Sequence, residues 1–290
     1  MLFSRSTLDI GQSTIRPFSF KQLIYLFPLI ASGCASAPLE QAGSLASYDG
    51  LSSANSKLTK AKFKTEGADL LLVKKVYIEP TVVSAAAIST TKSSSDRALV
   101  ANAIDRALCV GVSDRFEVVE KRENADFYVH ATITHIVPTN APMAGVSTVT
   151  SLGSSFVLPV GIPRLPVGLG GLSVEAEAVN KDGKQLAAMV WAKGANSLTT
   201  KARVSPVGDA YSLATSFGND FSTMLVTGKT PFKGWPKLPS SQKMKSSLGG
   251  KPKYPACERF GRAPGLADMA AGQLGLPPSW TDREASKAKQ

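Results

Sequence analysis

Two glutamates in the middle of the chain are of the type that performs acid–base chemistry. Glu175 and Glu177 stand two residues apart in an alternating run, so they share one face of a strand. Paired carboxylates of this kind can cleave glycosidic bonds. Valine and alanine occupy the alternate positions and mark the opposite face as the core. We therefore expect the glutamates on a solvated face or sheet edge, opposite lysines such as Lys193, in a structural role.

Two histidines are the candidate metal ligands. His130 and His135 are five residues apart on one predicted strand, and an odd separation places them on opposite faces. They are therefore not expected to share a metal ion. The sequence contains no His-x-x-x-His or Cys-x-x-Cys pattern, so we predict neither a metal site nor a cofactor.

Motifs for an activated nucleophile or a phosphate cradle are incomplete. Gly145-Val146-Ser147 lacks the second glycine of a hydrolase elbow. The glycines of residues 168–171 precede a strand and lack the Lys-Ser/Thr of a phosphate-binding loop. We predict no catalytic residues. A hydrolase that uses Glu175, Glu177 or a histidine stays open as an alternative.

The first cysteine indicates where the protein resides. An apolar run at residues 23–30 is too short to span a bilayer, and it is followed by Ala31-Ser32-Gly33-Cys34. This sequence resembles the lipobox of bacterial lipoproteins, which implies cleavage after residue 33 and lipidation of Cys34. Ala35, where an aspartate would imply retention in the inner membrane, implies the periplasmic face of the outer membrane. The alternative is an ordinary secretory signal with an incidental cysteine.

The other two cysteines are a candidate disulfide. Cys109 and Cys257 are the pair that remains in an oxidising compartment once Cys34 is lipidated. A bond between them would tie the distal end of the chain to its core. Two unpaired thiols are the alternative.

The positive charge is concentrated near the C-terminus. Of the formal net charge of +11, residues 229–290 hold +8, whereas residues 35–228 are almost neutral. This distribution weakens a nucleic-acid interpretation, and we expect no nucleic-acid partner. The sequence instead offers six lysines as candidates for binding anionic envelope lipid or polymer, unless the tail is simply solvated: Lys233, Lys237, Lys243, Lys245, Lys251 and Lys253.

The elements that position these residues follow from periodicity. Apolar spacing predicts one helix that Ser93 caps and Gly111 ends, and a second from Ser205-Pro206 to Gly228. On the first helix Asp105 and Arg106 lie off the apolar face. Alternation predicts strands, two of them joined by an Asp182-Gly183 turn, near residues 70–80, 116–119, 126–137, 172–179 and 185–195. The order β-α-β-β-β-β-α predicts an α+β fold, a mostly antiparallel sheet with two helices on one face.

Four segments follow from this pattern. Residues 1–33 are the signal peptide, residues 34–65 the lipid anchor and tether, and residues 66–228 the α+β domain. Residues 229–290 form an irregular basic tail. Within the domain, residues 138–171 are an apolar insertion with Arg164 as its single charge. This insertion either folds over the sheet or meets membrane or a partner subunit.

The same residues carry a family resemblance. The lipobox, the strand at residues 76–80, the strand at residues 125–129, and Val174-Glu175-Ala176-Glu177 before the Asp182-Gly183 turn resemble proteobacterial lipoproteins of the domain-of-unknown-function 3313 family. The resemblance covers about residues 30–230. It implies an anchor and a small α+β domain and brings no catalytic residues.

We therefore expect a non-catalytic, lipid-anchored periplasmic protein that binds a partner in envelope assembly or maintenance. The partner is an envelope protein or an anionic envelope polymer. A subunit of an oligomeric export or assembly complex, with residues 138–171 as its contact, is the first alternative. An uncharacterised envelope hydrolase is the second.

Overall fold

A computed structural model describes residues 36–55, 59–146, 148, 168–197, 199–233 and 238–282. The predicted signal peptide, Cys34, most of the insertion and Lys237 lie outside these residues. Among the helices that the structure describes, none has the length and apolar character needed to cross a membrane.

The described chain forms one mixed sheet of eight strands, which confirms the α+β class. In the order β1-β2-β8-β7-β6-β3-β5, with β4 paired to β6, neighbours from β1 to β6 run antiparallel, and β3, β4 and β5 add parallel pairs. The strands are β1 (Ser52–Asn55), β2 (Thr59–Thr65), β3 (Lys75–Ile78), β4 (Val82–Val83), β5 (Glu117–Val118), β6 (Phe127–Val137), β7 (Gly171–Asn180) and β8 (Gln185–Gly194).

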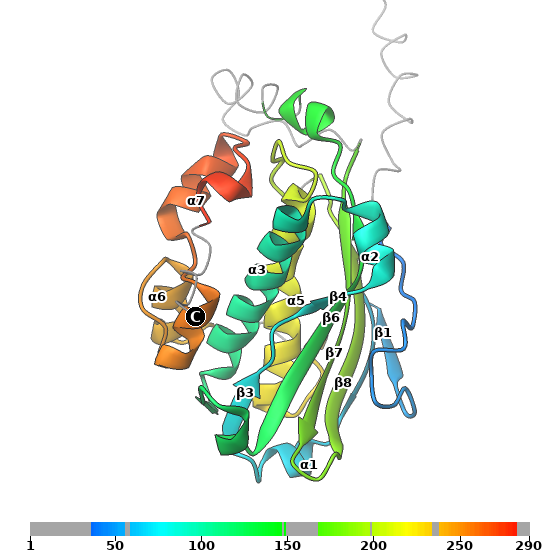
Figure 1. The fold of residues 1–290 in the computed structure, drawn as a ribbon, viewed down its shortest axis with the longest axis vertical. Helices are drawn as coiled ribbons and strands as arrows, with labels where there is room; N and C mark the ends of the chain where they lie inside the picture. The colour runs from blue at the N-terminus through cyan, green and yellow to red at the C-terminus, as the bar shows by residue number, and fades with distance from the viewer. Residues whose placement is uncertain are drawn as a thin grey trace, which may run out of the picture. The chain divides into compact units, whose positions relative to one another are not determined.

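Two long helices, α3 (Ser94–Val112) and α5 (Gly208–Thr227), cover one face of the sheet (Figure 1). Ser93 caps α3 as predicted, because its side chain accepts a hydrogen bond from the Asp96 amide at 3.1 Å. Gly228 ends α5 with φ of 64°. Short elements connect these parts: α1 (Gly67–Leu70), α2 (Ala85–Thr90) and a 3-10 turn at Arg122–Asn124.

Two predictions about the helix ends are wrong. Gly111 does not end α3, which continues to Val112. A Cβ on Gly111 would lie 2.1 Å from Ser222 Oγ of α5, so the glycine is there to let the two helices approach. The second helix begins at Gly208 rather than at Ser205-Pro206, with Val207 as its N-terminal flanking residue.

The core lies between these helices and the sheet. Trp191 of β8 is fully buried, and its ring meets that of Phe217 with centroids 5.5 Å apart. The indole Nε1 donates to Asp220 Oδ2 at 2.9 Å, which gives the buried donor a partner. Burial and this hydrogen bond together fix α5 against the sheet.

The segment predicted as a tether is largely part of the fold. Strands β1 and β2 extend the sheet, and Leu45 packs with Ala188 and Val190 on the face opposite α3 and α5 (Figure 1). We term residues 37–48 the strap. Its sequence has little periodicity, and the sheet holds it largely through hydrogen bonds to its backbone, which is why alternation did not predict it.

The residues predicted as an irregular tail also fold. Residues 238–282, here termed the C-terminal layer, contain α6 (Ser241–Ser247), a 3-10 turn at Pro255–Phe260, α7 (Gly265–Gln273) and a 3-10 turn at Pro278–Trp280. The layer packs outside α3 (Figure 1). Its covalent and ionic links to the core, described below, are what order it.

Candidate functional site

The predicted disulfide is present and fastens the C-terminal layer to the core. Cys109 of α3 bonds to Cys257 of the turn at Pro255–Phe260, with the two Cα atoms 5.7 Å apart. Both residues are buried. The bond closes a loop of 148 residues that contains β5, β6, β7, β8 and α5.

A buried ion pair is the second link. Arg106 of α3 donates through Nη2 to Asp282 Oδ2 at 2.6 Å and through Nη1 to Oδ1 at 3.2 Å. Tyr211 of α5 donates its hydroxyl to the same carboxylate at 2.7 Å. Burial and the Asp282 charge raise the pKa of Tyr211 above its ordinary value. Arg106 and Asp105 were predicted to lie off the apolar face, but both are buried because the layer covers Arg106 and Thr81 covers Asp105.

A second arginine holds α7. Arg203 precedes α5 and donates to both carboxylate oxygens of Asp268, at 2.8 and 2.7 Å, and to the Asp268 carbonyl at 3.1 Å. Thr281 donates its hydroxyl to Asp268 Oδ1 at 2.6 Å. The planar guanidinium matches such a two-point contact, which gives it geometric specificity.

Some of the basic side chains in the layer serve to attach it. Arg259 donates to the Tyr77 hydroxyl at 3.2 Å and to the carbonyl of Ile78, at the end of β3. Lys253 donates through Nζ to the Ser113 carbonyl at 2.9 Å. Part of the positive charge near the C-terminus is therefore structural.

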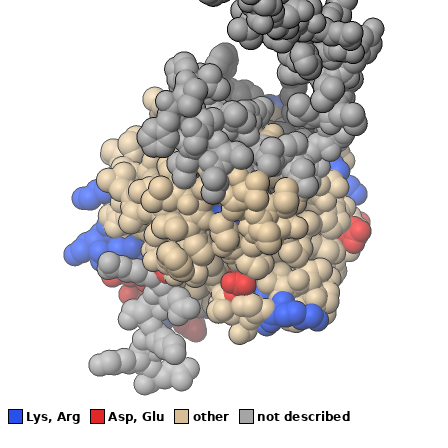
Figure 2. All heavy atoms as spheres, turned by 90° about the horizontal axis from the view of Figure 1, so that it is seen from above, with Lys and Arg blue, Asp and Glu red and all other residues tan. Residues whose placement is uncertain are grey.

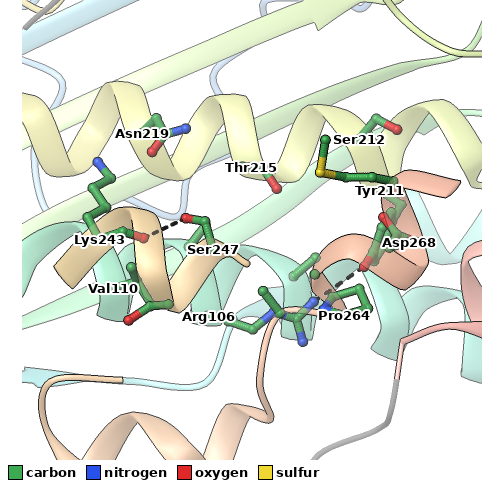
Figure 3. Close-up of a pocket in the computed structure, with 16 residues that line it drawn as sticks. Arg106, Val110, Tyr211, Ser212, Thr215, Asn219, Lys243, Ser247, Pro264 and Asp268 are labelled. Atoms are coloured by element: carbon green, nitrogen blue, oxygen red, sulfur yellow. Dashed lines mark hydrogen bonds between the residues drawn. The ribbon is translucent and has the colours of Figure 1, made fainter. Parts of the chain in front are cut away.

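A cavity of about 210 Å³ lies in the seam between α3, α5 and the layer (Figure 3). Thr215 and Asn219 of α5 face it from one side, and Lys243 and Ser247 of α6 lie across from them. Burial lowers the pKa of Lys243, and the Asp114 charge opposes this shift. Apolar lining from Val110, Met269 and neighbouring alanines completes a site suited to an apolar group with a hydrogen-bonding or anionic end.

The two glutamates are not solvated, contrary to prediction. Glu175 and Glu177 lie beneath the strap, 0% and 7% exposed. Glu175 accepts from the amides of Ala42 and Ser44 at 2.8 and 3.2 Å and from the Tyr48 hydroxyl at 2.8 Å. Lys193 is not their partner. It lies opposite Leu172 of β7, whose side chain points to the other face of the sheet from Glu175. The Glu175 carboxylate therefore binds the strap through these donors.

Glu177 completes this set of contacts. It accepts from the Ala46 amide at 2.9 Å and from Gln185 Nε2 at 2.7 Å. Two buried carboxylates thus receive backbone N–H donors from the same segment. Such charge-assisted hydrogen bonds are stronger than neutral ones.

The histidines share a face, which also differs from prediction. A register shift between Ile133 and His135 adds one residue to β6, so His130 pairs with Glu177 and His135 with Ser173 on the same side of β7. The two partners are four residues apart, about 13 Å along a strand, too far for the histidines to share a metal ion. Within the described residues no group of three His, Cys, Asp or Glu side chains is placed to hold one.

With this geometry in place, the family can be assigned. A family model described as "Protein of unknown function (DUF3313)" matches residues 40–221. The chain belongs to this family. The match contains most of the strap, the sheet, α3 and most of α5, and it ends before the C-terminal layer begins.

The similarity of the chain to solved structures is distant. A PelC dodecamer from Paraburkholderia phytofirmans is 8% identical, with a TM-score of 0.36 over 59% of this chain and 100% of that chain. A DUF4136 family protein from Bacteroides thetaiotaomicron is 10% identical, with a TM-score of 0.33 over 60% of this chain and 100% of that one. No curated protein matches the chain.

The outer surface of the layer beyond the DUF3313 match is rich in exposed apolar side chains. Trp280 is 71% exposed and Leu266 68% exposed. Most of the large apolar side chains that the structure describes as exposed belong to this layer: Leu238, Met244, Leu248, Leu266, Met269, Leu274 and Trp280. Leu248 and Trp280 also line a groove of about 690 Å³ on the layer together with Arg262.

The six candidate lysines have different surroundings. Lys233, Lys245 and Lys251 are exposed, Lys243 is half-buried beside the cavity, and Lys253 is exposed but bonds to Ser113. Lys237 lies outside the described residues. Anion binding by these side chains stays a prediction. The arginine–aspartate links were not predicted, and their separations of 176 and 65 residues left no local signal for them.

Proposed function

We propose that this DUF3313 protein is a non-catalytic, lipid-anchored envelope protein that binds a protein partner through its C-terminal layer. Cys34 carries the anchor, and the protein faces the periplasm from the outer membrane. The lipobox resemblance supports the anchor, and the disulfide is compatible with an oxidising compartment.

The apolar surface of the layer is the observation that carries the proposal. A disulfide, the buried Arg106–Asp282 pair and the partly buried Arg203–Asp268 pair hold the layer on the core, yet many of its large apolar side chains remain exposed. Exposed apolar patches rimmed by charge are typical of protein–protein interfaces. The exposed Lys245 and Lys251 favour a partner that combines apolar anchors with acidic residues.

The engagement of the candidate catalytic groups supports a non-catalytic role. Glu175 and Glu177 are held by the strap, and His130 faces Glu79, with Nδ1 3.3 Å from Oε2. The cavity in the seam can receive a side chain of the partner, because it opens beside Met269 on the exposed surface.

Two experiments test the proposal. Cys34→Ala, followed by fractionation and mass spectrometry, is expected to abolish lipidation and release the protein from the membrane; an unlipidated wild-type protein would overturn the anchor. A photo-crosslinking amino acid at Leu266 is expected to capture a discrete envelope protein in cells. The matched control is Leu72, which is 78% exposed and lies outside the layer. Identical adducts from both positions, or none from Leu266, would contradict partner binding.

A further inference from the structure

The strap fixes where the chain enters the fold. Ala37 is buried, and a Cβ on Gly171, the first residue of β7, would lie 3.1 Å from the Ala37 Cβ. Ser173 donates its hydroxyl to the Pro38 carbonyl at 2.6 Å. Farther along β7, Glu175 and then Glu177 hold the rest of the strap. The strap therefore runs along β7 and starts at the end of the sheet where β7 begins.

This geometry leaves only a very short connection between the proposed lipid anchor at Cys34 and the folded domain. Ala37 is three residues after Cys34, and three residues of extended chain span at most about 11 Å. A lipid on Cys34 would therefore hold the beginning of β7 next to the bilayer. A flexible tether of about thirty residues would instead let the domain move several nanometres away.

The surface at this end suits a bilayer. Residues 138–146 and 168–171, the two described ends of the insertion between β6 and β7, contain no charged side chain. Asp209 lies at the same end but is buried, and its carboxylate accepts from the Gly170 amide at 2.7 Å. Viewed from this end, the described surface is mainly uncharged, with basic and acidic side chains at the rim (Figure 2).

Exposed apolar side chains lie on the same surface. Val146 is 51% exposed and Val204 42% exposed. They are neighbours, because a Cβ on Gly145 would lie 3.6 Å from Val204 Cγ2. The Val204 amide donates to the Gly275 carbonyl at 2.8 Å, which brings exposed Leu274 alongside. We term Val146 and Val204 the anchor-end face, and Leu274 marks the edge where this face meets the C-terminal layer.

The opposite end of the sheet has a different character. Helix α1 lies there (Figure 1), and its exposed neighbour Leu72 stands among charged side chains. Lys184 Nζ is 2.6 Å from Asp69 Oδ2, and Lys74 and Lys75 follow in sequence. Exposed apolar side chains occur at both ends. At the α1 end Leu72 stands beside these charged groups, whereas residues 138–146 and 168–171 at the anchor end carry no charge.

We propose that the anchor-end face rests on the lipid bilayer, so that the protein sits on the membrane in a fixed orientation. The inference rests on the proposed anchor at Cys34 and adds to it a second, non-covalent contact. The C-terminal layer flanks α3 at the side of the domain, and its groove therefore stays accessible to a periplasmic partner.

The test uses the lipidated full chain in vesicles of phosphatidylethanolamine and phosphatidylglycerol. Benzoylphenylalanine is placed singly at Val146, Val204 and the control position Leu72, and lipid adducts are measured by mass spectrometry after flotation and illumination. Positions 146 and 204 are expected to give several-fold more lipid adduct than position 72, although Leu72 is the more exposed side chain.

The outcomes separate the two claims. A protein that floats with the vesicles but gives equal lipid adducts at the three positions overturns the bilayer contact and leaves the anchor intact. A protein that does not float overturns the anchor and the inference together. Two positions on the face guard against a local disturbance at either one, and circular dichroism verifies that each variant is folded.

Discussion

Arg106 and Asp282 form an ion pair in which Nη2 lies 2.6 Å from Oδ2, with both side chains buried between α3 and the last residues that the structure describes. The pair joins two segments 176 residues apart. Because Phe260 and Tyr211 also contact these groups, the pair closes the C-terminal layer over the core.

Removing one partner of this pair is expected to be costly. Asp282→Ala would leave Arg106 charged and buried, and we expect the free energy of unfolding to fall by about 3–5 kcal/mol. The double variant Arg106→Met/Asp282→Leu, which removes both charges, is expected to lose less. Urea denaturation of the three proteins measures the difference; a double variant less stable than Asp282→Ala would contradict this account of the pair.

The disulfide is expected to stabilise the layer more than the rest of the domain. Cys109→Ser with Cys257→Ser should lower the free energy of unfolding by about 2–5 kcal/mol, because the loop that it closes is long. Limited proteolysis is expected to cleave first within residues 238–282. Reduction of the wild-type protein provides the matched control, and cleavage that begins in the sheet domain instead would argue against a separately fastened layer.

Asp105 is expected to give stability a distinct dependence on pH. Burial raises the pKa of Asp105 to about 7, although Thr81 donates its amide to the carboxyl at 3.0 Å. Between about pH 4 and about pH 7 Asp105 therefore binds more protons in the folded state than in the unfolded state. Its contribution to stability falls as pH rises through this window and is constant above it.

Asp105→Asn isolates this contribution. Burial also raises the pKa of Asp220, so the wild type alone does not separate the two groups. The difference in unfolding free energy between variant and wild type should grow in favour of the variant by roughly 2–3 kcal/mol from pH 5 to pH 8. A difference that is constant over this range would show that Asp105 does not titrate in it.

An added methyl group at the contact between α3 and α5 is expected to lower the free energy of unfolding. A Cβ on Gly218 would lie 2.4 Å from the Ala107 Cβ, so Gly218→Ala should cost about 1–3 kcal/mol. Gly145→Ala is the matched control. Gly145 lies in a helical turn at residues 141–146, where helical propensity favours alanine, and its Cβ would meet only Val204, at 3.6 Å. Thermal unfolding of the two variants measures the difference in stability. Equal losses of stability would contradict the claim that close packing between α3 and α5 requires glycine at position 218.

Patterns among neighbouring residues predicted three of the long strands, one turn and the start of one helix. Alternation located β6, β7 and β8, the Asp182-Gly183 turn joined two of them, and Ser93 marked the start of α3. The disulfide followed from the number of cysteines and the inferred compartment. These features depend on neighbouring residues or on simple elimination.

Features that depend on distant partners were not predicted. The sequence pattern predicted a solvated Glu175, because it does not reveal that backbone amides more than 130 residues away bind this carboxylate. His135 changes faces because of a register shift that alternation alone does not reveal. Arg203 and Asp268 are 65 residues apart in the chain and meet because the C-terminal layer packs against the core. Long-range contacts hold the strap and, through other residues, the C-terminal layer.

The most direct test of the account is the affinity of the layer for the protein captured at Leu266. Its dissociation constant is measured for the lipidated wild type, Leu266→Ser and the control Leu72→Ser. We predict that Leu266→Ser weakens binding by at least about tenfold, or 1.4 kcal/mol, and that Leu72→Ser leaves it unchanged. Equal affinities for all three proteins would contradict binding through the C-terminal layer.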